Sequence, residues 1–258
     1  MNCGLLDEGT EALIEGLREN SSLKHLYLGG NGIGVAGIRA LAAYIESGSC
    51  HLSDLSLSCN RLGDEGIAIL CKAMLSDGAK SIIRLNVASC GIGPVGAGHL
   101  AALIRENSTL KHLDAGFNKM TAPLKEVANC MGSEGAQLIA TALLDNQTLT
   151  SLSLMHNQIH QNGIEAIRDA LGGAAIADMS SPSLRNTSIV HIWLEQMGVP
   201  FNELTREDIR SSIARNRALI SPEDFKASEE ASRPAHLDEV ASVYRLNGLY
   251  SEDSESSA

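Results

Sequence analysis

One pattern recurs about six times along the chain, and it constrains the fold more than any other feature of the sequence. Its form is L-x-x-L-x-L-x-x-(N/C)-x-(I/L), where x is any residue. Copies begin at Leu23, Leu52, Ile82, Leu110, Leu149 and, in a weaker form, Ile189. The alternating apolar positions of each copy predict a short strand, and an apolar segment with helical spacing follows. Because one such unit cannot bury its own apolar edge, the repeat predicts that successive units stack on one another.

The polar position of the pattern, called the marker position below, sets the length of the unit. It is filled by Cys3, Asn31, Asn60, Cys90, Asn118 and Asn157, at intervals of 28, 29, 30, 28 and 39 residues. Units of about 28 residues resemble the leucine-rich repeats of ribonuclease inhibitor, the Ran GTPase-activating protein and NOD-like receptors. The resemblance covers about residues 1–200. It implies an α/β, right-handed leucine-rich-repeat solenoid in a horseshoe arc, with parallel strands on the concave face and helices on the convex face.

The two ends of the chain carry further expectations. Residues 1–220 are expected to form the solenoid, closed by a capping helix near 205–217 with a capping-box-like start at Thr205. Its core-facing residues are expected to be Ile209, Ile213 and Ala214, and its solvent-facing residues Arg206, Arg210, Arg215 and Arg217. Residues 221–258 are expected to form an acidic, partly disordered tail, with a linker over 221–234 and a short helix near 236–246.

At the N-terminus, the sequence opens inside a unit, since no strand and no polar cap precede Cys3. An uncapped solenoid end exposes a strand edge and apolar surface. Three interpretations stay open: the natural product is longer, the gene start is misassigned, or the chain associates with itself through this edge.

The net charge and the cysteines limit which partners and which cellular compartment are expected. The net charge is −11, and residues 221–258 hold nine acidic against three basic residues, which disfavours nonspecific binding to nucleic acid or to an anionic membrane. No segment resembles a signal peptide or is long enough to span a bilayer. The six cysteines include no C-x-x-C pair, so reduced thiols in a cytoplasmic protein are expected, with Cys3 and Cys90 in structural roles at the marker position.

Motifs that resemble chemical sites have simpler explanations. Gly32-x-Gly34-x-x-Gly37 resembles a dinucleotide fingerprint, but a second copy at Gly91 shows that the glycines belong to the repeat turn. His156 and His160 are four residues apart in a predicted loop, without the glutamate of a zinc protease motif. No nucleophile motif and no phosphate loop is present. The sequence therefore predicts no cofactor, no metal site and no enzymatic activity.

The outward positions of the predicted strands indicate a binding surface. Aromatic residues and arginine are the usual anchors of protein interfaces, and acidic residues there would select a partly basic partner. The candidate partner-binding residues are Tyr27, Asp54, Arg84, Asp114, Phe117, Lys119, Met155, Trp193 and Glu195. The sequence thus predicts a non-enzymatic adaptor or scaffold that binds another protein on its concave face and on rim insertions. The alternative for each residue is an ordinary solvated side chain of a sheet.

Two interruptions of the period are expected on opposite rims of the arc. One is an insert of eleven residues between Asn118 and Asn129, and the other lies around residues 172–183. Insertions in repeat proteins are either functional loops or tolerated length variation. Two alternative functions stay open from the resemblance: a GTPase-activating accessory protein, in which Arg84 and Lys119 would act on phosphate charge, and an enzyme inhibitor like ribonuclease inhibitor.

Overall fold

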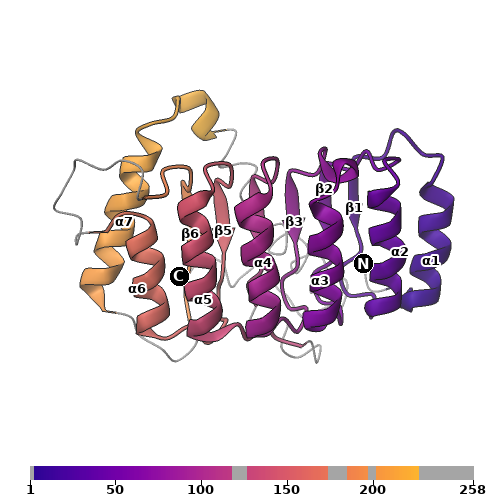
Figure 1. Cartoon of the computed structure of the whole chain (residues 1–258), viewed down its shortest axis with the longest axis horizontal. Helices are drawn as coiled ribbons and strands as arrows, with labels where there is room; N and C mark the ends of the chain where they lie inside the picture. Colours follow the sequence, from indigo (N-terminus) through magenta and orange to yellow (C-terminus); the bar gives the residue numbers. More distant parts are fainter. Residues whose placement is uncertain (1–2, 118–126, 174–184, 197–201, 227–258) are drawn as a thin grey trace, which may run out of the picture.

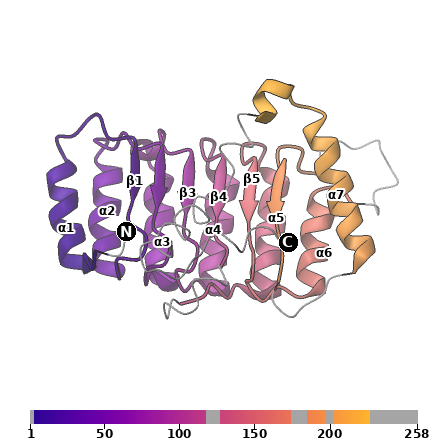
Figure 2. The same cartoon turned by 180° about the vertical axis from the view of Figure 1, so that it is seen from behind.

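Six parallel strands, stacked in chain order, form one layer of the protein, and helices form the other. The computed structural model describes residues 3–117, 127–173, 185–196 and 202–226. Figure 1 looks onto the helices and Figure 2 onto the strands. The strands are β1 (His25–Tyr27), β2 (Asp54–Ser56), β3 (Arg84–Asn86), β4 (His112–Asp114), β5 (Ser151–Ser153) and β6 (His191–Trp193). The helices are α1 (Leu6–Leu17), α2 (Val35–Glu46), α3 (Gly63–Met74), α4 (Pro94–Glu106), α5 (Gly132–Asp145), α6 (Gln161–Ala170) and α7 (Glu203–Arg217), with a 3-10 turn η1 (Asp77–Ala79).

The central apolar residue of every strand lies in one line across the sheet. The register pairs Leu26, Leu55, Leu85, Leu113, Leu152 and Ile192 in succession. On the opposite side of the core, α2 presents Ile38, Leu41, Ala42 and Ile45, all buried. This spacing of three and four residues follows from 3.6 residues per turn. The predicted solenoid, with its shared aliphatic core, is confirmed.

The turn between strand and helix is tied to the preceding unit by a carboxylate. Asp7 Oδ1, from α1, accepts hydrogen bonds from the backbone N–H groups of Gly34 (2.7 Å) and Gly37 (3.0 Å) at the start of α2. A Cβ atom on Gly37 would lie 2.8 Å from Ile33 Cγ2 and 2.9 Å from Asp7 Oδ1, so a larger side chain does not fit. Asp64 of α3 repeats the arrangement with Gly93 and Gly96 at α4. The N-termini of α2 and α4 are thus capped from the neighbouring unit.

Side chains at the marker position form a ladder of hydrogen bonds. Asn60 Oδ1 accepts from the N–H groups of Asn31 (3.1 Å) and Ile33 (2.9 Å), and its Nδ2 donates to the carbonyl oxygens of Leu28 (2.9 Å) and Leu57 (2.7 Å). One buried amide therefore serves main-chain groups of two successive turns, and the N–H groups of Asn31 and Ile33 would otherwise lie unpaired in the core.

The ladder corrects one predicted marker residue. After Cys90 the position is filled by Asn129, which accepts from the N–H groups of Cys90 and Ile92, both at 2.9 Å. Asn118 lies outside the described residues. The residues after Asn118 fit the short pattern as well as those after Asn129, but only Asn129 directly precedes the turn into α5. In the last unit, Gln196 takes the position by accepting from the N–H of Ile159 (3.2 Å).

The two cysteines at marker positions behave differently. The buried Cys90 thiol donates to the carbonyl oxygen of Leu57 (3.1 Å), as its structural role predicts. Cys3 is exposed, unlike the buried Cys90. There the main chain joins the ladder instead, since the Cys3 N–H donates to Asn31 Oδ1 (2.9 Å).

A second asparagine ladder follows the ends of the helices. Asn146 Nδ2 donates to the carbonyl oxygens of Ile104 (2.6 Å) and Asn107 (3.1 Å), and Asn146 Oδ1 accepts from the N–H of Leu149 (2.8 Å). The other members are Asn107, Asn186 and Asn216. Asn216 belongs to α7 and donates to the carbonyl oxygen of Ile189 (2.8 Å), which fixes α7 at the end of the stack.

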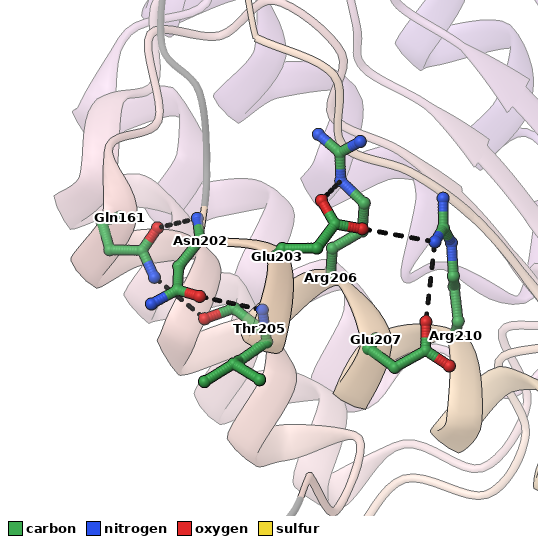
Figure 3. A network of polar contacts seen from close by, with 8 residues as sticks. Gln161, Asn202, Glu203, Thr205, Arg206, Glu207 and Arg210 are labelled. Atoms are coloured by element: carbon green, nitrogen blue, oxygen red, sulfur yellow. Dashed lines mark hydrogen bonds and ion pairs between the residues drawn. The ribbon is translucent and has the colours of Figure 1, made fainter.

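Helix α7 is the predicted cap, with corrections to its details. Its N-cap is Asn202, whose Oδ1 accepts from the Leu204 N–H (2.8 Å). Thr205 lies inside the first turn, buried, and its hydroxyl accepts from Gln161 Nε2 (2.9 Å), as Figure 3 shows. The expected start at Thr205 is therefore three residues too late, because an asparagine in extended backbone supplies the cap.

The faces of α7 also differ in part from expectation. Ile209 and Ile213 are buried as predicted, but Ala214 is exposed. Arg215 does not point freely into solvent: its guanidinium donates to the carbonyl oxygen of Leu171 (2.6 Å), at the end of α6. Terminal helix carbonyls lack partners within their helix, which explains this contact. Arg217 likewise donates to the carbonyl oxygen of Val190 (2.9 Å).

Residues 221–226 are not a linker, which corrects the sequence prediction for this part. They fold into a short helical turn, and the Phe225 ring stacks on the His191 ring of β6 with 5.5 Å between centroids. The predicted helix near 236–246 and the rest of the acidic tail lie outside the described residues. Among the helices that the structure describes, none has both the length and the apolar content needed to cross a bilayer.

Candidate functional site

The concave face presents two rows of side chains, each with one residue per strand. The first row contains His25, Asp54, Arg84, His112, Ser151 and His191. The second row contains Tyr27, Ser56, Asn86, Asp114, Ser153 and Trp193. The rows exist because side chains alternate between the two faces of a strand, and the in-register pairing then aligns equivalent positions of successive units.

Asp54 organises the N-terminal half of the first row. The residue is only 5% exposed. Its carboxylate accepts from His25 Nδ1 (2.8 Å) and the Ser53 hydroxyl (2.5 Å), while Arg84 Nη1 lies 3.1 Å from its second oxygen. A buried carboxylate requires such partners, because its desolvation is otherwise costly. The Asp54 network therefore fixes the guanidinium of Arg84 and the ring of His25 in place.

The centre of the rows is polar, buried and incompletely hydrogen-bonded. Burial, together with the positive charge of Arg84 nearby, lowers the pKa of His112 to about 4, so its ring is neutral at pH 7. Within the part of the chain that the structure describes, His112 Nδ1, Asn86 Nδ2 and Ser153 Oγ are buried atoms without a hydrogen-bond partner. Asn86 is 6% exposed and Ser153 2% exposed. Buried polar atoms without partners each cost about 1–3 kcal/mol, so groups that paired with them would gain that energy.

Aromatic side chains stand at both ends of the second row. Tyr27 is 47% exposed and stacks beside His25, with 6.4 Å between ring centroids. Trp193 is partly exposed and stacks on His191 at 6.0 Å. Five strand spacings of about 4.8 Å separate the two ends, roughly 24 Å in all. A ligand that contacts both rings must span this distance, which is the scale of a protein or a folded peptide.

The structure places the predicted binding residues in three groups. Tyr27, Arg84, Asp114, Met155, Trp193 and Glu195 lie on the concave face with exposed or partly exposed side chains. Asp54 and Phe117 lie there too but are buried, Phe117 with 7% exposure, so a partner reaches them only after neighbouring atoms move. Lys119 lies outside the described residues. The first group is therefore the accessible part of the predicted surface.

His25 and His191 are outward strand positions in the sequence pattern, but they were not among the candidate partner-binding residues. Each lies two residues before one of the aromatic residues, in the sequences His25-Leu-Tyr27 and His191-Ile-Trp193. The repeated aromatic-x-aromatic spacing on a strand places two rings on the same face, and that signal was available. Phe225 carried no such signal, because its contact with His191 joins residues that are far apart in the chain.

The glycine-rich and histidine motifs that resemble chemical sites have structural roles in the fold. The N–H groups that a nucleotide phosphate would need at Gly34 and Gly37 are already bonded to Asp7. His160 is the residue before α6, where its N–H donates to the Ser133 hydroxyl (3.0 Å). Within the described residues, no three histidine, cysteine, aspartate or glutamate side chains are grouped as metal ligands. The concave surface is suited to recognition through shape, charge and hydrogen bonds.

Comparison with known proteins agrees with this architecture. The family model described as Leucine Rich repeat matches residues 19–42, 48–71, 78–101 and 145–167. Ribonuclease inhibitor from Sus scrofa is 27% identical over 179 residues, which cover 58% of this chain and 39% of the inhibitor. The chain contains leucine-rich repeats that are similar to those of ribonuclease inhibitor. Each matched segment includes a strand of the concave face and the start of the helix that follows it.

Larger proteins contain similar repeats. "NACHT, LRR and PYD domains-containing protein 14" from Mus musculus is 31% identical over 186 residues, covering 65% of this chain and 18% of that protein. This leucine-rich-repeat chain thus spans less than half of these curated relatives. Among solved structures, leiomodin-1 actin-binding site 2 superposes with a TM-score of 0.56 at 14% identity, over 74% of this chain and 95% of that one. That likeness supports the fold alone.

Proposed function

We propose that this leucine-rich-repeat chain is a non-enzymatic adaptor that holds another protein against its concave face. The observation that carries the proposal is the first row and second row together: a polar, partly unpaired centre between aromatic side chains at both ends. Large rings with a polar handle make strong contacts at little entropic cost, which is why they dominate interface energies. A rigid sheet adds affinity because little order is lost on binding.

The charges of the accessible residues support a partner with basic groups at two places. Asp114 lies in the middle of the second row, and the exposed Glu195 lies beyond Trp193 at the C-terminal end. Arg84 is partly neutralised by Asp54, so it contributes a directed donor more than a net charge. We therefore expect basic side chains of the partner to face Asp114 and Glu195, and acceptor groups to face Arg84 and Asn86. None of the six cysteines, all in the described residues, forms a disulfide, which supports the cytoplasm as the compartment.

The test is affinity purification of the full chain from its native cell, followed by interface mutagenesis against the partner identified. Replacement of Tyr27, Asp114 and Trp193 by alanine is expected to weaken binding at least about 100-fold, because two aromatic anchors at roughly 2 kcal/mol each are removed. A matched triple variant on the convex face is Arg39→Ala, Glu65→Ala and Leu138→Ala, which should leave the dissociation constant within about twofold. Unchanged binding of the concave variant, with circular dichroism showing an intact fold, would overturn the proposal.

Inhibition of a ribonuclease is a second candidate, and the similarity to ribonuclease inhibitor from Sus scrofa favours it. The chain spans 39% of that protein, so it would make a smaller contact. A titration of ribonuclease with this chain decides the question: loss of RNA cleavage at a stoichiometric amount of the chain supports inhibition. GTPase activation has less support, because Arg84 is held by Asp54 and Lys119 lies outside the described residues. Faster GTP hydrolysis by a small GTPase in the presence of a stoichiometric amount of this chain would support GTPase activation.

A further inference from the structure

The segment that follows α7 is packed against the rest of the protein mainly through one side chain. Residues 221–226 form a helical turn with internal hydrogen bonds: the Ser221 hydroxyl donates to Asp224 Oδ2 (2.6 Å), and the Phe225 N–H donates to the Ser221 carbonyl oxygen (2.9 Å). Five of these six residues are exposed, and Phe225 is the partly buried one. Because few buried contacts hold the turn, we expect it to open locally without unfolding α7.

Two groups from different elements contact the Phe225 ring. The ring stacks on the His191 ring of β6, with 5.5 Å between centroids and 19° between planes, and the Arg217 guanidinium carbon lies 5.1 Å from its centroid. Arg217 is held in position for this contact, because its Nε donates to the carbonyl oxygen of Val190 (2.9 Å). His191 and Arg217 therefore form a preorganised site for one aromatic ring, called the ring site below.

The ring site adjoins the surface proposed for partner binding. Trp193, from the same strand as His191, stacks on the His191 ring with 6.0 Å between centroids and 13° between planes. The segment that contains Phe225, yellow in Figure 2, turns from α7 toward this end of the sheet. A partner that packs on Trp193 therefore reaches Phe225 as well, and a ring of the partner can take over the two contacts that Phe225 makes.

We propose that the ring site binds one aromatic side chain of the partner, and that Phe225 occupies this site in the unbound chain. The inference rests on the proposed adaptor function, since the partner must supply the ring. The site selects an aromatic side chain, because a flat π face stacks on imidazole and attracts a guanidinium, whereas an aliphatic side chain does neither. If Phe225 fills the site for about 80–90% of the time, the dissociation constant of a competing ring rises about five- to tenfold.

The test uses two small probes that need no partner, N-acetyl-phenylalanine amide and N-acetyl-leucine amide. Trp193 is the single tryptophan of the chain, so the NMR signal of its indole N–H reports binding at the adjoining ring site. In the variant Phe225→Ala, the phenylalanine probe should shift this signal saturably, and the leucine probe should bind at least about fivefold more weakly. In the unmodified chain, the phenylalanine probe should bind about five- to tenfold more weakly than in the variant.

Paired arginine variants test the ring site itself. In Phe225→Ala/Arg217→Gln the preference for the phenylalanine probe should disappear, whereas Phe225→Ala/Arg210→Gln changes an exposed arginine of the same helix and should keep the preference. Circular dichroism checks that α7 stays folded, and Phe225→Leu, which retains an apolar contact, takes the place of Phe225→Ala if it does not. No saturable shift in the variant, equal binding of the two probes, or equal binding by the variant and the unmodified chain overturns the proposal.

The partner identified by affinity purification separates this inference from the adaptor proposal. Phe225→Ala should bind that partner about five- to tenfold more tightly than the unmodified chain does. Unchanged or weaker binding would show that the partner does not use the ring site, and the inference then fails while the adaptor proposal stands. Survival of partner binding in the triple concave variant, by contrast, refutes the adaptor proposal whatever the probes show.

Discussion

Asn129→Ala is the substitution for which the structure gives the clearest energetic expectation. The side chain is fully buried, and its amide is hydrogen-bonded to five main-chain groups. Two of them, the carbonyl oxygens of Ala115 and Gly116, also accept other hydrogen bonds. The N–H groups of Cys90 and Ile92 and the carbonyl oxygen of Val87 (3.0 Å) depend on Asn129. A buried group that loses its only partner costs about 1–3 kcal/mol, so the sum is roughly 3–9 kcal/mol. Water can enter the space left by the amide, and we expect about 4 kcal/mol, near the lower end.

The neighbouring marker position supplies the control. Cys90 is also fully buried, but its thiol donates to the carbonyl oxygens of Leu57 and Ala88, each of which accepts another hydrogen bond as well. Cys90→Ala should therefore cost only about 1 kcal/mol. Urea titrations followed by circular dichroism give both free energies of unfolding. A loss below about 1 kcal/mol for Asn129→Ala, or one no larger than for Cys90→Ala, would refute the argument that the ladder is an energetic necessity.

Two more expectations follow from the fold. Gly37→Ala should lower the free energy of unfolding by about 2 kcal/mol, since the new methyl group meets Asp7 and Ile33; a urea midpoint equal to that of the unchanged protein would contradict this. His112 should show no titration by NMR above about pH 5, because its pKa is about 4. The unfolded histidine binds a proton near pH 6.5, so the contribution of His112 to stability is complete above that pH and is lost as the pH falls towards 4. The variant His112→Asn should flatten this part of the pH dependence.

The periodicity of the sequence was sufficient to predict the fold, because each repeat places apolar residues at the same positions. Leu26, Leu55 and Leu85 occupy the same position in three successive units, and this equivalence gives the register of the strands. Spacing alone failed at Asn118, where a regular interval of 28 residues favoured the wrong asparagine. The deciding property is which amide adjoins the turn into the next helix, and counting residues does not contain that property.

The candidate surface was predictable in outline and not in detail. Alternation along each strand predicted which residues face outward, but the burial of Asp54 depends on His25 and Arg84 from the two neighbouring units. The contact of Phe225 with His191 and the donation by Arg215 to the end of α6 depend on how α7 closes the stack. Interactions between distant parts of the chain leave no periodic signal, so a single sequence does not reveal them.

The bridging amides at the marker positions also limit how the length of such a chain can change. Each amide serves the turn of its own unit and the turn before it, as Asn60 does for Asn31 and Ile33. Excision of residues 32–60 would join Asn31 directly to Arg61 and restore an equivalent turn, whereas removal of half that length would strand main-chain groups in the interior. Chimeras and gene duplications are thus best joined at these asparagines. Changes that add or remove whole units should come in blocks of about 28 codons, whereas loop inserts such as the eleven residues between Asn118 and Asn129 leave the ladder in register.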